Sequence, residues 1–374
     1  MNVVFIIRSL ANAHGAERTF IDKANWLSEK GHSVVMVTYE QGSHPFAFPL
    51  SASVRHIDLG CRYFQLYQYS FLRRWVEGER MKRQFRQRLQ SVIDEFRVEV
   101  VVSTTYSTDF ISSIMSVRKQ VPVVLESHSA FVGDMCPHSF WRKIQRAFIL
   151  QDFKKCDLLI ALTKGDAACW RKHIHAVAVV PNPLPYYCSD LGDVQRREGR
   201  IISVGRLYGP KRFDRLIDAF SMIADRHPQW FVDIYGEGED HQKLAGQIVS
   251  LGLSERVFLK SSTSDIFSEY KQSQFLVVSS DNEGFSLVLV EAMACGIPVV
   301  STSCPFGPLE IVENHVTGLL AELEAKDLSE KMEWMITHEA ERRAMGERAH
   351  QSVARYQKHR VMKEWEAAYL SVLR

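Results

Sequence analysis

The sequence predicts an α/β protein made of two doubly wound, Rossmann-like domains. Short apolar runs rich in valine and isoleucine recur along the chain, and each is followed by a segment with helical spacing. Continuous apolar runs of this kind are typical of parallel strands that helices cover on both faces. The alternation breaks once, near residues 181–200, and then starts again, which divides the 374 residues into two halves of similar size.

The first half contains five runs that we expect to form strands, at 3–7, 34–39, 98–103, 121–127 and 157–162. Helices are expected between them, at about 16–30, 77–96, 109–119 and 141–155. We therefore assign residues 1–182 to an N-terminal domain.

The second half repeats the pattern, with expected strands at 201–205, 231–236, 257–260, 275–280 and 297–301. Its expected helices lie at about 213–226, 239–251, 265–272 and 287–295. Residues 183–200 are proline-containing and polar, which indicates a linker, so the C-terminal domain is assigned to residues 201–355. Ligands of doubly wound folds bind at the carboxyl ends of the strands, and two such domains are expected to face an interdomain cleft.

The last segment, 356–374, has helical spacing with one apolar face that includes Val361, Trp365 and Tyr369. Because this face must cover an apolar surface, we expect the helix to pack back on the N-terminal domain.

Composition excludes several classes of protein. Apolar residues make up 46% and charged residues 24%, as in ordinary globular proteins, and the net charge of +2 gives no reason to expect a nucleic-acid partner. The seven cysteines are odd in number and include no C-x-x-C pair, which favours a reducing compartment. No apolar run approaches the ~20 residues that span a bilayer. We expect a cytoplasmic protein whose membrane contact, if any, is peripheral.

The stretch 279–300 carries two glutamates in different settings. Glu283 falls in a loop after an apolar strand, and Glu291 falls within the helix that follows. Ser286 is expected to be the N-cap of that helix, and the unpaired amides from Gly284 through Phe285 to Leu287 would then form a site for an anion or a hydroxyl. The alternatives are a glycosidase-like carboxylate pair, a metal pair, or two structural glutamates.

The stretch 202–220 places cations where a strand ends. Gly205 closes the strand, and Arg206, Lys211 and Arg212 follow before a helix begins. Cations beside a helix N-terminus suit a diphosphate, whereas solvated surface cations are the alternative.

Further along, Gly236 and Gly238 form a G-x-G turn without the third glycine of a dinucleotide fingerprint. We interpret it as a tight turn beside a nucleotide base or ribose.

Two loops of the first half are candidate site elements as well. Gly15 follows the first strand and allows close backbone approach, although a simple loop glycine would look the same. His128 follows the run 121–127 at the carboxyl end of a buried strand, where it could be a functional residue or a structural one.

Together these motifs, in this order and over nearly the whole chain, resemble the retaining glycosyltransferases of family 4, which have the GT-B fold. The specific part is the Glu-x7-Glu element of Glu283 and Glu291, with Gly284 and Phe285 after the first glutamate. The weaker parts match as well: Gly205, Arg206 and Lys211 to a diphosphate motif, Gly236 and Gly238 to a turn, and His128 to an active-site histidine.

By this resemblance, Glu291 would bind the donor ribose, and Glu283 with the amides of 284–287 would hold the sugar and its phosphate. Arg206 and Lys211 would neutralise the leaving diphosphate, so that no metal or other cofactor is needed. The resemblance implies front-face attack with retention, in which the leaving phosphate takes the proton of the acceptor. His128 would lie beside the donor sugar.

Two motifs depart from the family pattern. The Gly-Gly-x-Glu loop after strand one has become His14-Gly15-Ala16-Glu17. The Gly-Gly-x-x-Glu motif after the fifth strand of the second domain keeps one glycine, Gly307, which with Phe306 is expected beside the donor sugar.

The segment 63–96 mixes aromatic and basic residues and is expected to include a basic amphipathic helix. Arg80, Lys82, Arg83 and Arg86 are candidates to bind an anionic inner-leaflet membrane or a lipid diphosphate, and a solvated helix face is the alternative.

The favoured function is transfer of a hexose or N-acetylhexosamine from a nucleotide sugar, by resemblance a UDP-sugar, to a glycan acceptor that is expected to be lipid-linked. Bacterial polysaccharide, lipopolysaccharide, capsule or glycoprotein glycan synthesis is implied. Lys260 and Ser261 are expected to contribute to base selection. The alternatives are a GT-B sugar-nucleotide epimerase and a non-catalytic nucleotide-sugar-binding subunit.

Overall fold

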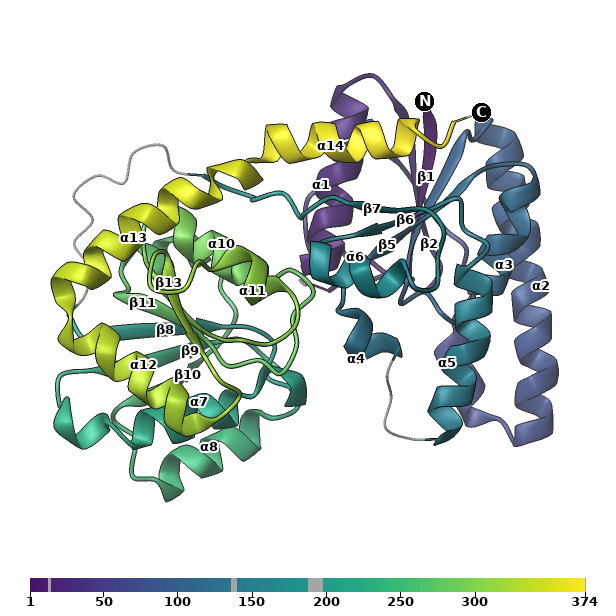
Figure 1. The fold of residues 1–374 in the computed structure, drawn as a ribbon. Helices are drawn as coiled ribbons and strands as arrows, with labels where there is room; N and C mark the ends of the chain where they lie inside the picture. The colour runs from purple at the N-terminus through teal and green to yellow at the C-terminus, as the bar shows by residue number, and fades with distance from the viewer. Residues whose placement is uncertain (13–14, 136–139, 188–197, 374) are drawn as a thin grey trace. The chain divides into compact units, whose positions relative to one another are not determined.

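The chain folds into two compact units, drawn in Figure 1. Unit 1 comprises Met1–Pro181 and Val361–Arg374, and unit 2 comprises Asn182–Arg360. The computed structural model describes residues 1–12, 15–135, 140–187 and 198–373. Each unit is a parallel sheet with helices on both faces, which confirms the predicted pair of doubly wound α/β domains.

Unit 1 is built on a seven-stranded parallel sheet with the order β3-β2-β1-β4-β5-β6-β7. The strands are β1 Asn2–Ile7, β2 Ser33–Thr38, β3 Arg55–Asp58, β4 Val100–Thr104, β5 Val123–Ser127, β6 Leu158–Ala161 and β7 Val177–Val179. Every residue of the central strands β4 and β5 is buried, as the continuous valine runs predict.

The handedness of the connections explains where the helices of unit 1 lie. Parallel strands are joined by right-handed crossovers, so reversing the direction of travel along the sheet moves the helix to the other face. The helices are α1 Gly15–Glu29, α2 Phe71–Phe96, α3 Ile111–Met115, α4 Phe131–Met135, α5 Phe140–Phe153, α6 Lys164–Trp170 and α14 Lys358–Leu370. The steps from β1 to β2 and from β2 to β3 both run away from β4, and α1 is the helix that these steps contain, which places α1 on one face and the later crossover helices on the other.

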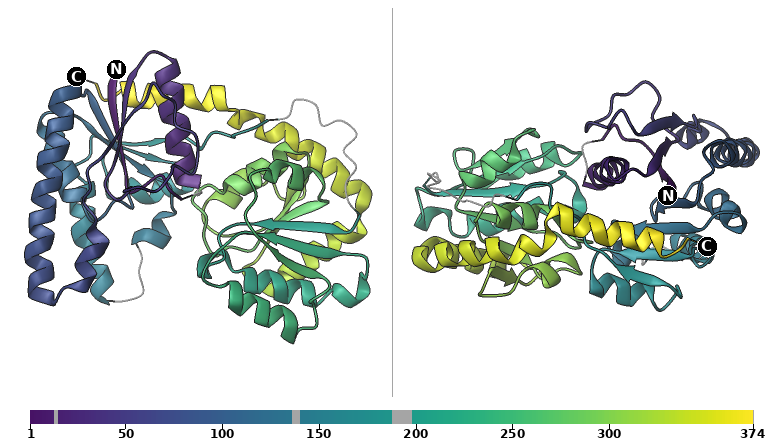
Figure 2. Two further views of the ribbon diagram at one scale, coloured as in Figure 1. Left: turned by 180° about the vertical axis from the view of Figure 1, so that it is seen from behind. Right: turned by 90° about the horizontal axis from the view of Figure 1, so that it is seen from above.

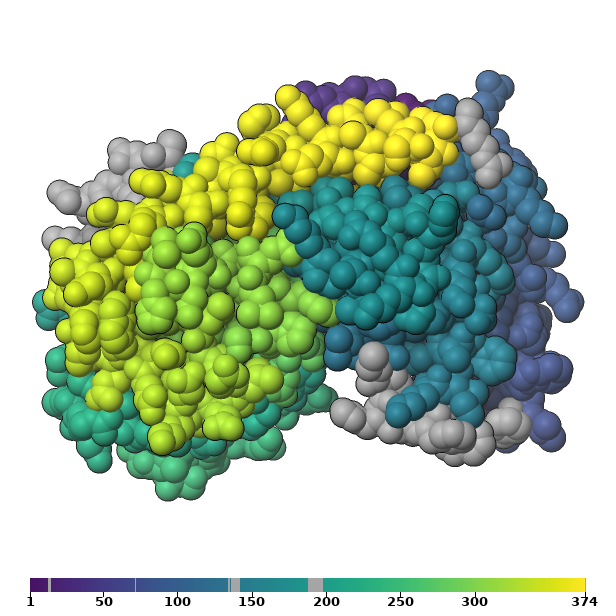
Figure 3. All heavy atoms as spheres, in the orientation of Figure 1, coloured from purple at the N-terminus to yellow at the C-terminus, as the bar shows by residue number. Residues whose placement is uncertain are grey.

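The C-terminal helix α14 packs on the same face of the sheet as α1 and covers the part of that face that α1 leaves open. Tyr369 packs edge-to-face on Phe5 of β1 at 5.8 Å between ring centroids, and Trp365 donates a hydrogen bond to the Pro181 carbonyl at 2.9 Å. Figure 3 shows the last turns of this helix, in yellow, packed beside teal segments of the same unit. Residues from Val361 onward therefore belong to unit 1.

Unit 2 is built on a six-stranded parallel sheet with the order β10-β9-β8-β11-β12-β13. The strands are β8 Arg200–Val204, β9 Phe231–Tyr235, β10 Val257–Lys260, β11 Phe275–Val278, β12 Val299–Thr302 and β13 Gly318–Ala321. The strand order reverses between the neighbouring strands β8 and β11, and this is the switch point at which doubly wound folds bind ligands.

The helices of unit 2 cover both faces of its sheet, as the views in Figure 2 show. They are α7 Phe213–Ser221, α8 His241–Ser250, α9 Ile266–Lys271, α10 Leu287–Ala294, α11 Gly307–Ile311, α12 Ala325–Thr337 and α13 Glu339–Val353. Helix α12 packs beside α7 and extends that layer over β12 and β13, while α13 packs on α10. One apolar core lies between the sheet and the layer that contains α7, α8 and α12.

Three strands were not predicted: β3, β7 and β13. All three lie at the edge of a sheet and have three or four residues, and β3 is polar. β7 lies within the apolar run 176–180, which was not assigned to a strand. Most of the predicted linker, residues 188–197, lies outside the described residues. In the part of the chain that the structure describes, no helix has the length and apolar character to cross a bilayer.

Candidate active site

The donor-side residues predicted from the sequence gather at one edge of unit 2. Gly205 follows β8, Gly236 follows β9, Ser261 follows β10 and Glu283 lies in the loop after β11. The carboxyl ends of parallel strands share one edge of the sheet, so the topology alone brings these loops together.

Lys211 and Glu283 form an ion pair at this edge. Lys211 Nζ lies 2.6 Å from Glu283 Oε1, and Ser280 Oγ donates to the same oxygen at 2.7 Å. The side chains are 23% and 9% exposed, so the pair is sheltered but still open to solvent. Burial by itself would lower the pKa of Lys211, but the charge and hydrogen bond of Glu283 outweigh it and raise that pKa. Lys211 is thus a permanent cation.

The backbone of Glu283 fixes a second loop beside it. Glu283 N–H donates to the Pro305 carbonyl at 2.8 Å, and the amides of Phe306 and Gly307 donate to the Glu283 carbonyl at 2.7 and 2.9 Å. A Cβ at Gly307 would lie 2.3 Å from the Phe285 carbonyl oxygen, so only glycine fits there. The structure thereby brings together the Glu-x7-Glu loop and the Phe306-Gly307 segment.

Helix α10 begins directly after this loop, with Ser286 at its N-cap position. The expectation of a capping serine is only half right, because the Ser286 side chain makes no capping bond. The cause is its left-handed backbone, with φ of 70°, since a capping serine takes extended angles. Its Oγ is buried and has no hydrogen-bond partner among the described residues. Backbone strain and an unpaired polar group beside a helix N-terminus are typical of ligand sites.

The other members of this loop and helix take distinct positions. Leu287 is the first residue of α10, Gly284 is partly exposed, and Phe285 is buried edge-to-face on Tyr356 at 5.2 Å. Glu291 is 6% exposed, and Tyr270 Oη donates to its Oε2 at 3.3 Å. This bond orients the second glutamate of the signature.

The G-x-G turn packs tightly against the loop that carries the cations. A Cβ at Gly236 would lie 1.9 Å from the Gly205 carbonyl oxygen, and one at Gly238 would lie 2.1 Å from the Leu207 carbonyl oxygen. Leu207 N–H in turn donates to the Glu237 carbonyl at 2.8 Å. The two glycines are therefore required by backbone contact between the loops.

Arg206 and Lys260 are exposed on either side of that turn. The Arg206 guanidinium lies over the Tyr208 ring, 4.0 Å from its centroid. The Lys260 carbonyl accepts a hydrogen bond from Gly236 N–H at 3.0 Å, and Ser261 follows as an exposed residue. Unlike Lys211, the side chains of Arg206 and Lys260 make no ion pair with any residue that the structure describes.

In unit 1, the predicted His128 lies just beyond β5, and its side chain is 4% exposed. Gly15 is the first residue of α1, where its carbonyl accepts from Thr19 Oγ1 at 2.7 Å. His14, in the same predicted loop, lies outside the described residues.

Sequence reasoning missed a buried ionic cluster beside His128. Glu126 Oε2 lies 2.5 Å from Lys23 Nζ and 2.7 Å from His128 Nε2, and Tyr369 Oη donates to Glu126 Oε1. The available signal was a charged residue in an apolar pattern: Glu126 interrupts a valine-rich strand, and Lys23 lies on the apolar face of α1.

The predicted basic helix is α2, which begins at Phe71 rather than near residue 77. Arg80, Arg83 and Arg86 are exposed, whereas Lys82 is partly buried and pairs with Glu79 at 2.9 Å. Large apolar side chains are also exposed on α2 and just before it: Phe64, Tyr67, Leu72, Trp75 and Val76.

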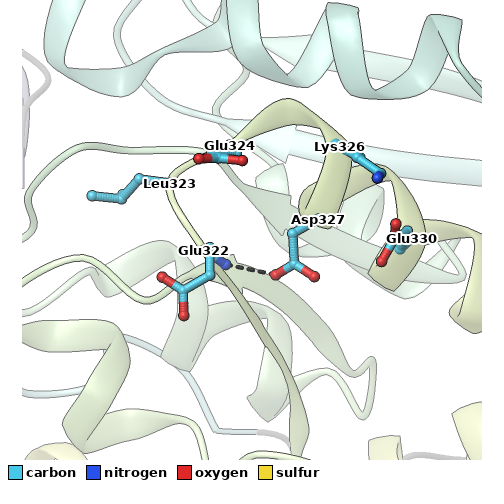
Figure 4. A pocket seen from close by; sticks show the side chains of 6 residues that line it. All are labelled: Glu322, Leu323, Glu324, Lys326, Asp327 and Glu330. Atoms are coloured by element: carbon cyan, nitrogen blue, oxygen red, sulfur yellow. Dashed lines mark hydrogen bonds between the residues drawn. The ribbon is translucent and has the colours of Figure 1, made fainter.

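A separate hollow in unit 2 contains none of the predicted residues. It lies where β13 leads into α12 and is lined by acidic side chains, with Asp327 accepting a hydrogen bond from Glu322 N–H at 2.7 Å (Figure 4). Across the described ranges, no three histidine, cysteine, aspartate or glutamate side chains are grouped to hold a metal ion.

Comparison with known proteins shows which family this arrangement of residues belongs to. The model of glycosyl transferases group 1 matches residues 193–352, and the model of glycosyltransferase family 4 matches residues 13–185. An uncharacterized glycosyltransferase of Haemophilus influenzae is 24% identical over 85% of each chain. The amylovoran biosynthesis glycosyltransferase AmsD of Erwinia amylovora is 23% identical over 97% of this chain and 98% of AmsD.

Among solved structures, the TarM protein of S. aureus in complex with UDP superposes with a TM-score of 0.79 at 13% identity, over 99% of this chain and 100% of TarM. The two family models fall on the two doubly wound units, and the donor-side motif residues lie together at the carboxyl edge of unit 2. The chain therefore belongs to glycosyltransferase family 4, has the GT-B fold and is a glycosyltransferase.

Proposed function

We propose that this enzyme transfers a hexose or N-acetylhexosamine from a UDP-sugar to a glycan acceptor, with retention of the anomeric configuration. The observation that carries this proposal is the arrangement around the N-terminus of α10. There the Lys211–Glu283 pair and the unpaired Ser286 hydroxyl lie in the loops that follow the neighbouring strands β8 and β11. A sugar diphosphate needs such a set: a cation and helix amides for the phosphates, and a carboxylate for the sugar hydroxyls.

The charge of the leaving group explains why cations matter. As the bond between the anomeric carbon and the phosphate oxygen breaks, the diphosphate gains negative charge. Fixed cations such as Lys211 and Arg206 stabilise this charge most in the transition state. In front-face attack, the acceptor oxygen bonds to the anomeric carbon on the side that the phosphate leaves, and its proton passes to the departing phosphate oxygen. No metal is required, so we expect turnover to persist in EDTA.

The two signature glutamates divide the donor between them. Glu283, beside Lys211 and the α10 amides, is assigned to the sugar, and Glu291, one turn further along α10, is assigned to the ribose hydroxyls. UDP as the nucleotide is supported by the TarM complex, which contains UDP. A role in bacterial polysaccharide synthesis is supported by the similarity to AmsD, which acts in amylovoran biosynthesis.

Donor specificity can be tested by thermal shift with UDP-, GDP- and ADP-sugars. We expect UDP-sugars alone to raise the melting temperature, and Glu291→Ala to reduce that shift. Glu283→Ala should lower sugar transfer more than UDP binding. The control is Glu339→Ala, which removes an exposed pair on α13 and should change neither. A protein that no nucleotide sugar stabilises would contradict the proposal.

The same assay separates the rival functions. An epimerase would convert the sugar nucleotide without any acceptor, and a binding subunit would be stabilised by the donor without turning it over. NMR of the product would show whether the anomeric configuration is retained.

We further propose that the acceptor is lipid-linked and that α2 brings unit 1 to the anionic inner leaflet of a membrane. Leu72, Trp75 and Val76 are exposed on the first turns of α2, and Arg80 and Arg83 continue the same helical face. Apolar side chains followed by cations on one face suit the boundary between lipid tails and anionic headgroups. Lys82, paired with Glu79, is expected to contribute least of the four predicted cations.

Vesicle sedimentation tests this surface. Changing Arg80, Lys82, Arg83 and Arg86 to glutamate should abolish binding to anionic vesicles, and Trp75→Ser should weaken it. Arg343→Glu is the matched control for Arg80, because the two side chains are 70% and 76% exposed. Undiminished binding by the fourfold variant would refute the membrane role and leave the donor site unaffected.

A further inference from the structure

The buried cluster around His128 is the starting point. Nε2 of His128 lies 2.7 Å from Glu126 Oε2, and the ring packs against Phe20 with 5.5 Å between centroids. Its other nitrogen, Nδ1, is buried and has no hydrogen-bond partner among the described residues. A buried polar atom without a partner is costly, and in a native structure it calls for a specific reason.

Glu126 is held in place from three elements. Lys23 of α1 and His128 both contact Oε2, and Tyr369 of α14 donates to Oε1. The carboxylate has 0% exposed surface, so these three donors fix its position. Burial alone would raise the pKa of Glu126, but Lys23 and His128 outweigh it and lower that pKa, so that Glu126 stays ionised.

This ionisation determines which nitrogen of His128 carries the proton. A carboxylate only accepts hydrogen bonds, so the nitrogen facing it, Nε2, must be the donor. Burial lowers the pKa of His128; its hydrogen bond with Glu126 opposes that, while the Lys23 charge adds to it. Glu17 of α1 and Glu126 favour the charged ring, yet the net shift is downward. At neutral pH the ring is therefore neutral, with a proton on Nε2 and a lone pair on Nδ1.

We propose that Glu126 is a positioning residue that fixes the His128 ring so that Nδ1 offers its lone pair to a hydroxyl group of the sugar substrate. This role rests on the proposed function. Nδ1 in this state accepts a hydrogen bond from O–H and gains nothing from a carbonyl or a phosphate oxygen. The cluster therefore selects a substrate that presents a hydroxyl at this point.

The first test needs no substrate. NMR of ¹⁵N-histidine-labelled protein reports which ring nitrogen is protonated, and comparison with His128→Gln assigns the signal among the 14 histidines. We expect the Nε2–H form in the native protein. A His128 ring protonated on Nδ1 would overturn the proposal, whatever the activity proves to be.

The second test uses Glu126→Gln. We expect the fixed tautomer to be lost and kcat to fall about tenfold, as for one lost hydrogen bond, with UDP affinity within about twofold of the native value. A Glu126→Gln protein that folds with an unchanged tautomer and unchanged kcat would overturn the proposal. If this variant does not fold, the His128 tautomer measured in the native protein still tests the proposal.

The matched control is Asp157→Asn. Asp157 Oδ2 accepts from Val123 N–H at 2.9 Å, at the opposite end of the same strand as Glu126, so this change perturbs β5 without touching the cluster. We expect its tautomer and kcat to match the native protein. If no sugar nucleotide is turned over, the proposed function fails, but the NMR result for Glu126 and His128 stands by itself.

Discussion

Each unit contains a lysine–glutamate pair toward the carboxyl ends of its parallel strands, and the two pairs differ in how much of them solvent reaches. Lys23 and Glu126 lie 2.5 Å apart in unit 1 and are 1% and 0% exposed. Lys211 and Glu283 lie 2.6 Å apart in unit 2 and are 23% and 9% exposed. The contacts are almost equal in length, so any difference in role comes from their surroundings.

The surroundings shift the pKa values of the two lysines in opposite directions. Burial lowers the pKa of Lys23 to about 8 despite the charge of Glu126, whereas burial of Lys211 is outweighed by Glu283, whose charge and hydrogen bond raise the pKa of Lys211. A sealed pair can act on a substrate only through a neighbour such as His128. A pair that solvent reaches can meet a ligand directly. The same two residue types thus support positioning in one unit and binding in the other.

The largest expected effect follows from breaking the sealed pair. Lys23→Met leaves the Glu126 charge buried without its cation, and we expect the free energy of unfolding to fall by about 3–5 kcal/mol. Chemical denaturation measures this loss. Adding Glu126→Gln to Lys23→Met should recover part of it, and a double variant as unstable as the sum of the singles would show that the residues do not interact.

Breaking the open pair should instead affect catalysis. Lys211→Met is expected to lower kcat by about 10²–10³-fold, since a fixed cation beside the leaving diphosphate is lost. Its free energy of unfolding should change by no more than about 1 kcal/mol, because the pair is partly solvated. Steady-state kinetics and denaturation of the same preparation check both. A Lys211→Met protein that is strongly destabilised but fully active would contradict the assignment of this pair to binding rather than to stability.

The pH dependence of stability gives a smaller effect of defined sign. Between pH 8 and the ordinary lysine pKa of 10.5, the unfolded chain binds more protons at Lys23 than the folded protein does, so raising the pH favours folding. From pH 8 to about 9.5 we expect the stability gap between the native protein and Lys23→Met to widen, by at most about 2 kcal/mol. A gap that narrows over this interval would contradict the lowered pKa.

The smallest effect concerns Ser286. Its Oγ makes no hydrogen bond within the described residues, so Ser286→Ala should change the free energy of unfolding by less than about 0.5 kcal/mol. UDP affinity, measured by calorimetry, should fall by about three- to tenfold if this hydroxyl binds the donor. Unchanged affinity would remove Ser286 from the donor site.

Much of the fold and of the donor site could be predicted from local sequence signals. The buried valine runs predicted the central strands, and the strand–loop–helix order placed Glu283 before α10 and Glu291 within it. The resemblance to family 4 then named the motif residues. The edge strands β3 and β13 were not predicted, because a short edge strand lacks the continuous apolar run of a strand buried on both faces.

The tertiary structure was needed wherever residues far apart in the sequence meet. Lys23, Glu126 and Tyr369 show no common pattern, yet parallel pairing brings β5 beside β4, and the β2–β3 connection adds no helix beside α1, which leaves room for α14. The left-handed backbone of Ser286 was equally invisible, since it follows from how the preceding loop is tied to the Phe306-Gly307 segment. The doubly wound class could be inferred from the sequence alone because it follows from hydrophobic periodicity, and the motif residues could be named because their order and spacing resemble those of family 4. Only the folded chain decided which lysine–glutamate pair is sealed and which stays open, because exposure depends on helices that return from distant parts of the chain.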